Sequence, residues 1–155
     1  MKVKTITLAL AMLAVAVGLR AQQDPLIGTW KLNLAKSKYS PGPPPKSQTL
    51  KVEAQGDALK ITADTVNADG TTQHLQYTAK PDGKDYPITG DPDRDSTTMK
   101  RIDAYTTEVA GKKAGKATMT FRRVVSKDGK TVTITGTGTN AKGQKVNNVA
   151  VYDKQ

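Results

Sequence analysis

Three arginines in segments of alternating polarity are the first candidates for binding chemistry. Arg123 shares one face of its segment with Phe121, whereas Arg122 falls on the opposite face, and Arg101 shares its side with Met99. We therefore expect Arg123 and Arg101 to point inward, where two cations beside apolar side chains would suit an amphipathic ligand with an acidic head. The alternative is that Arg123 pairs with an internal acid or reaches around an edge of the sheet, and that Arg101 lies on the surface.

Residues suited to catalysis or metal binding are few. His74 is the single histidine and the chain has no cysteine, so most nucleophile–base pairs and nitrogen or sulfur metal sites are unavailable. Asp91, Asp93 and Asp95 have the spacing of a calcium loop, but Ser96 stands where such a loop needs glycine. We expect a charged turn there, and predict no enzyme activity, no catalytic residue, no metal and no cofactor.

The elements that must position these residues are short strands. From Leu26 onward apolar and polar residues alternate, and pairs such as Asp69-Gly70 and Asp82-Gly83 between the alternating segments are typical of tight turns. The spacing leaves no room for crossover helices, so neighbouring strands should pair antiparallel. The predicted strands cover residues 28–34, 50–54, 59–63, 75–79, 96–102, 105–110, 117–126, 131–138 and 146–152.

A sheet of this length usually curls and closes, which removes two exposed edges. We therefore predict an all-β fold, an antiparallel up-and-down barrel of about eight to ten strands, with the proline-rich residues 40–46 as a stiff loop over one end. Alternation places the large apolar residues inside, where they either meet across the axis in a solid core or leave a cavity. The predicted inward wall comprises Trp30, Leu32, Leu50, Val52, Leu59, Ile61, Tyr77, Met99, Met119, Phe121, Val132 and Ile134.

The N-terminus has the pattern of a cleaved export signal. A basic leader, an uncharged apolar run from Thr5 to Leu19 and the small residue Ala21 predict a signal peptide at residues 1–21 and a single domain at residues 22–155. The run is short for a membrane span, which needs about 20 apolar residues, so we expect a periplasmic or secreted protein without a span in its mature form. The formal net charge is +10, but the basic residues are scattered, which argues against nucleic-acid binding.

Two resemblances follow from these residues. Residues 26–32, which contain Gly28-Thr29-Trp30, resemble the first strand of the calycin superfamily, which includes lipocalins and fatty-acid-binding proteins, and residues 151–154 resemble the last strand of the fatty-acid-binding branch. The resemblance implies a lipocalin-like barrel with the tryptophan closing its base and a late arginine, Arg122 or Arg123, packed across it. Ala150 stands where the fatty-acid-binding branch carries its carboxylate-binding arginine.

The whole region after the signal also resembles a group of bacterial exported proteins of unknown function, through stretches such as residues 83–90, 123–131 and 147–155. Together the patterns favour a monomer that binds a small hydrophobic or amphipathic ligand inside its barrel. The alternative is a solid barrel that binds an envelope protein or polysaccharide through residues 40–46 and 83–95. The predicted ligand-binding residues are Trp30, Tyr77, Met99, Arg101, Met119, Phe121, Arg123 and Tyr152.

Overall fold

The structure, a computed structural model, describes residues 23–155, and the predicted signal peptide lies outside them. The described residues form ten β-strands and one short 3₁₀ helix, η1 (Leu34–Lys36). The strands are β1 (Gly28–Leu32), β2 (Ser47–Gln55), β3 (Ala58–Val66), β4 (Thr72–Ala79), β5 (Tyr86–Thr89), β6 (Ser96–Arg101), β7 (Thr106–Lys113), β8 (Lys116–Val125), β9 (Thr131–Thr139) and β10 (Lys145–Lys154).

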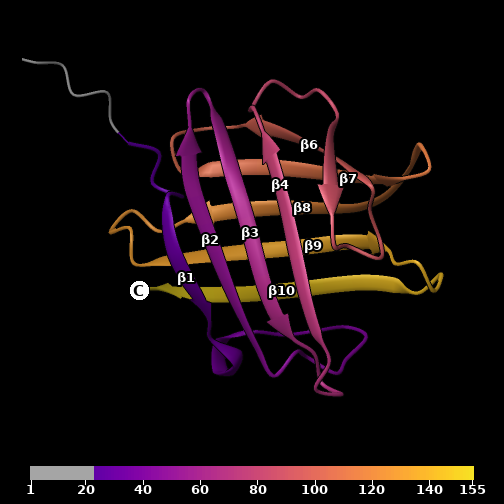
Figure 1. The fold of residues 1–155 in the computed structure, drawn as a ribbon. Helices are drawn as coiled ribbons and strands as arrows, with labels where there is room; N and C mark the ends of the chain where they lie inside the picture. The colour runs from indigo at the N-terminus through magenta and orange to yellow at the C-terminus, as the bar shows by residue number, and fades with distance from the viewer. Residues whose placement is uncertain (1–22) are drawn as a thin grey trace, which may run out of the picture.

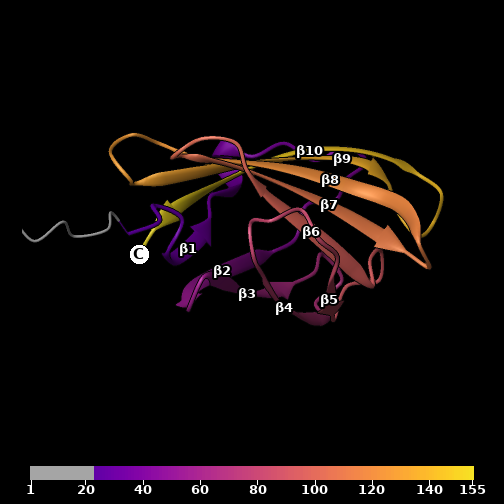
Figure 2. The ribbon, with the colours of Figure 1, turned by 90° about the horizontal axis from the view of Figure 1, so that it is seen from above.

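Each strand pairs antiparallel with its neighbours in the sequence, and β10 closes the sheet against β1 (Figure 1). The predicted closed, antiparallel up-and-down barrel is therefore confirmed. Seen from above, strands β7 to β10 lie in one layer and β2 to β5 lie opposite, so the barrel is flattened (Figure 2). Among the residues described, no helix has the length and apolar character needed to cross a bilayer.

Alternation along the strands explains how this barrel is filled. In β2, Leu50 and Val52 are buried while Lys51 is exposed, and the register with β3 sets Leu50 opposite Ala63, so the buried faces of the two strands coincide. Each large side chain that is fully buried stabilises the fold by about 1.5–3 kcal/mol. The predicted wall residues all lie inside: ten are buried, and Phe121 and Ile134 are partly buried against the same core.

One strand was missing from the prediction. Residues 83–95 were expected to form a loop, yet β5 lies within them, with two residue pairs to β4 and two to β6. Its four residues include Pro87, which cannot donate a ladder hydrogen bond, and Gly83 and Gly90 flank it closely. A strand so short and so interrupted has no clear alternation in the sequence.

The connections fall at two ends of the barrel. The end at which β1 begins also carries the β2–β3, β4–β5, β6–β7 and β8–β9 connections. The opposite end carries the long β1–β2 connection with its proline-rich segment, together with the β3–β4, β5–β6, β7–β8 and β9–β10 connections. As predicted, residues 40–46 contain no helix and end where β2 is about to begin.

Candidate functional site

The barrel is not packed solid. A cavity of about 110 Å³, partly open to solvent, lies between the β2–β4 wall and the β8–β10 wall. Apolar side chains from both walls and a small set of polar ones line this space, which is the usual composition of a small-molecule site. The lining residues are Gln48, Leu50, Ile61, Ala63, Leu75, Tyr77, Arg94, Phe121, Arg123, Ile134 and Tyr152.

Arg123 is the cation that β8 carries into this cavity. Its residue is 6% exposed, whereas Arg122 points outward and pairs with Glu108, so the predicted facing of the two arginines is confirmed. Nη2 of Arg123 donates a hydrogen bond of 2.6 Å to the hydroxyl of Tyr77 on β4. Its guanidinium carbon also lies 5.9 Å from the centre of the Tyr77 ring. The two side chains thus bridge the cavity from opposite walls.

A second arginine, Arg94, reaches the cavity from the loop between β5 and β6. Its Nε and Nη2 donate to one carboxylate oxygen of Asp91 at 2.7 and 2.6 Å, and both side chains are less than 10% exposed. The guanidinium carbon lies 4.5 Å from the centre of the Phe121 ring, a stacked cation–π geometry. Sequence reasoning missed this residue, because facing cannot be inferred from alternation in a loop.

Gly111 makes room for that arginine. The pairing of β7 with β8 shifts register between Ala110 and Lys112, so Gly111 lies at a β-bulge. A Cβ atom at Gly111 would overlap Cγ and Cδ of Arg94, so any larger residue would displace the side chain. The signal in the sequence that could have pointed to an inserted side chain is Gly111 itself, since a glycine within a strand often marks a bulge or a close approach of another group.

The loop that carries Arg94 is held by its own aspartates. Besides the Asp91 pair, Asp93 accepts a hydrogen bond of 2.6 Å from the backbone N–H of Ala141 in the β9–β10 turn. Asp95 accepts one of 2.7 Å from the N–H of Ala114 in the β7–β8 turn. The carboxylates with calcium-loop spacing therefore serve three different partners instead of converging on one point.

A polar chain leads from the cavity toward the β1–β2 connection. The hydroxyl of Tyr152 donates to Oε1 of Gln48, and Nε2 of Gln48 donates to the hydroxyl of Thr65 at 2.7 Å. Burial raises the pKa of Tyr152 well above its usual range, the nearby Tyr39 adds to this, and Arg123 partly offsets it. Tyr152 is therefore a neutral hydrogen-bonding group at neutral pH.

Trp30 lies outside the cavity lining, at the end where β1 begins. It is completely buried, and its indole N–H donates 2.8 Å to the carbonyl of Leu26. The cation above its ring is Lys154 of the last strand, at 5.0 Å, so the expectation that Arg122 or Arg123 packs there was wrong. Trp30 pairs directly with Lys154 across β1 and β10, and Gly28 leaves space for the lysine chain, since a Cβ there would lie 2.8 Å from its Cε.

The structure brings together only part of the predicted site. Tyr77, Phe121, Arg123 and Tyr152 line the cavity. Trp30, Met99 and Met119 are buried but do not line it.

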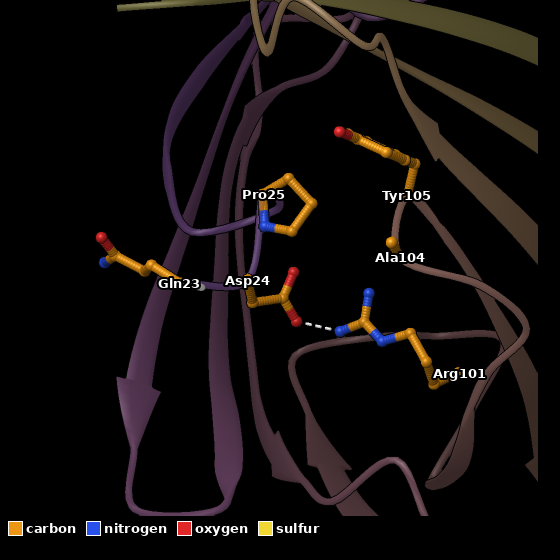
Figure 3. A pocket seen from close by; sticks show the side chains of 6 residues that line it. All are labelled: Gln23, Asp24, Pro25, Arg101, Ala104 and Tyr105. Atoms are coloured by element: carbon orange, nitrogen blue, oxygen red, sulfur yellow. Dashed lines mark hydrogen bonds and ion pairs between the residues drawn. The ribbon is translucent and has the colours of Figure 1, made fainter. Parts of the chain in front are cut away.

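Arg101 lies at the rim of the end where β1 begins, because β6 finishes there. Its Nη2 donates to the carboxylate of Asp24, and the pair borders a surface hollow with Pro25 and Tyr105 (Figure 3). Its charge is therefore compensated outside the cavity.

The sequence matches no protein-family model, and it matches no curated protein. Among solved structures, the chain is similar to zebrafish ileal bile-acid-binding protein complexed with cholic acid: the TM-score is 0.46 and the identity 11%, over 84% of this chain and 99% of that one. It is also similar to the siderocalin Ex-FABP, described as functioning through dual ligand specificities, with a TM-score of 0.40 and 11% identity, over 84% of this chain and 74% of the other.

Proposed function

We propose that this chain binds a small, largely apolar molecule inside its barrel. The observation that carries the proposal is the internal cavity of about 110 Å³ between the two walls. Leu50, Ile61, Leu75, Phe121 and Ile134 line it, so a ligand there would leave water for apolar contacts. The few polar groups come from four strands and from the β5–β6 loop, and they would fix its orientation.

Ala63 offers a direct test of the location. It lines the cavity from β3, so Ala63→Leu places three further carbon atoms in the space a ligand would use. Ala110→Leu adds the same atoms on β7, next to the inward Val109 and therefore on the outer face, and is the matched control. Circular dichroism of both variants checks that the barrel is retained.

The measurement is native mass spectrometry of each protein isolated gently from the cells that produce it. We expect a small-molecule adduct on the wild type and on Ala110→Leu, and its loss from Ala63→Leu. Bare protein in every sample would contradict internal binding. An adduct that Ala63→Leu retains would place binding outside the barrel, at loops such as residues 40–46 and 83–95.

Export to the periplasm or the exterior is also part of the proposal, on the basis of the leader pattern at residues 1–21. The intact mass of the protein recovered outside the cytoplasm should correspond to a chain that begins at Gln22. A mass that retains Met1 would exclude cleavage after Ala21.

A further inference from the structure

The two cavity arginines hold polar atoms that the described residues leave without a partner. Nη1 of Arg94, and both Nε and Nη1 of Arg123, are buried and have no hydrogen-bond partner among residues 23–155. A buried donor without a partner is costly, and most buried polar atoms in proteins are paired. Because both arginines line the same cavity, these three donors favour a ligand there with strong acceptor atoms.

The charges define that ligand further. Asp91 neutralises Arg94, since both guanidinium donors on that side bind its carboxylate. Arg123 has only the neutral hydroxyl of Tyr77 as a partner, and within the described chain no carboxylate lies in ion-pair range of it. The cavity thus carries one uncompensated positive charge, which a monoanion would balance. A phosphate monoester, with about 1.5–2 negative charges at neutral pH, would exceed it.

The volume limits the size of the ligand. A drug-sized ligand occupies a pocket of about 300–1,000 Å³, and a dry engineered cavity of about 150 Å³ holds benzene. The cavity here, about 110 Å³ and partly open to solvent, is closer in size to the second, although polar groups also line it. The face of Phe121 and the branched side chains of Leu75 and Ile134 provide apolar contacts for a body of that size.

We propose that the cavity takes a compact monocarboxylic acid whose apolar body is about the size of one benzene ring, and that Arg123 and Arg94 together bind its carboxylate. Planar guanidinium groups match the geometry of a carboxylate, and charge-assisted hydrogen bonds are about twice as strong as neutral ones. Arg123 supplies the balancing charge, and Arg94, fixed by Asp91 and stacked on Phe121, supplies an oriented donor. This inference rests on the proposed function, that the barrel holds a small ligand.

The probes are benzoate, its neutral near-isostere benzamide, and the long-chain acid dodecanoate, titrated calorimetrically into refolded, ligand-free protein. We expect benzoate to bind at least tenfold more tightly than benzamide, and dodecanoate to bind more weakly than benzoate. The Arg123→Met variant should lose at least tenfold in benzoate affinity and bind benzoate and benzamide alike. Arg94→Met should show a smaller loss in the same direction, while the outward-facing control Arg122→Met should match the wild type.

NMR spectra of the side-chain Nε–H of arginine and of the ring of Phe121 report where binding occurs. Shifts at Arg123 and Phe121 with benzoate support the proposal. Equal affinity for benzoate and benzamide, with those shifts, would overturn the role of the arginines and leave internal binding intact. Tighter binding of dodecanoate would overturn the size limit alone. Absence of binding by all three probes, with no shift at Phe121, would overturn this inference, whereas the native mass spectra of wild type and Ala63→Leu decide the proposed function separately.

Discussion

Replacing Arg123 with methionine should make the ligand-free protein more stable. The side chain is buried, two of its three nitrogens have no partner among the described residues, and methionine fills a similar volume without a charge. Replacing a buried ionic group with an apolar one of similar size is often neutral or stabilising. A residue kept for binding should therefore lower the stability of the empty barrel.

The size of the gain follows from the hydrogen bonds. Each unpartnered buried nitrogen costs about 1–3 kcal/mol, and the lost charged hydrogen bond to Tyr77 is worth about 1.5–3 kcal/mol. The midpoints give a net gain of about 2 kcal/mol in the free energy of unfolding. For a domain of this size that corresponds to a rise of about 6 °C in Tm.

The assay is urea unfolding of protein refolded from denaturant, followed by far-UV circular dichroism and the emission of Trp30. Arg122→Met is the control: its exposed pair with Glu108 should contribute less than about 1 kcal/mol. If Arg123→Met instead loses about 2 kcal/mol or more while the control is unchanged, Arg123 is compensated inside the protein. The reasoning from unpartnered donors would then be refuted.

Three further predictions concern the β7 bulge, the β1–β2 connection and the buried indole of β1. Gly111→Ala should lower the free energy of unfolding in urea by about 1–3 kcal/mol, because the new methyl group displaces Arg94. Combining it with Arg94→Ala should recover most of that loss. If the effects of the two substitutions simply add, the contact between the two residues is contradicted. Burial raises the pKa of Tyr39 to about 12, so its neutral phenol supports the fold fully below its ordinary pKa, and that stability is lost as the pH rises from about 10 through 12. Urea titrations over this interval should show a smaller fall for Tyr39→Phe than for the wild type; parallel curves would exclude the effect. Trp30→Phe should lose about 2 kcal/mol by the same assay read by circular dichroism, since a buried hydrogen bond and ring volume disappear, and an unchanged midpoint would contradict its structural role.

Period-two alternation was sufficient to predict the barrel and most of its interior. Side chains of a strand alternate between the solvent-facing and the core-facing side. The facing of Arg123 and Arg122 could therefore be inferred from the residue types beside them. The same reasoning correctly put Arg101 on the side of Met99. It could not show that β6 ends at Arg101, where the side chain turns to Asp24 at the rim.

The parts that were missed depend on long-range contacts. Arg94 enters the barrel because a bulge at Gly111, about 17 residues later in the chain, leaves space for it, and nothing local to Arg94 indicates this. Lys154 lies over Trp30 because barrel closure pairs the last strand with the first. Closure could be expected from the sequence, but the register that sets those two residues side by side could not.

The short length of β5 has a consequence for how a ligand could enter and leave the barrel. With two residue pairs to each neighbour, against nine between β2 and β3, it is the described strand with the fewest paired residues. Local opening is easiest where pairing between strands is least extensive. Arg94 follows this strand after only a few residues. A fluctuation that separates β5 from its neighbours would therefore also displace Arg94, one of the two arginines proposed to bind the ligand. Opening of the barrel wall and loss of the Arg94 contact to the ligand would then occur together, while the other nine strands stay paired.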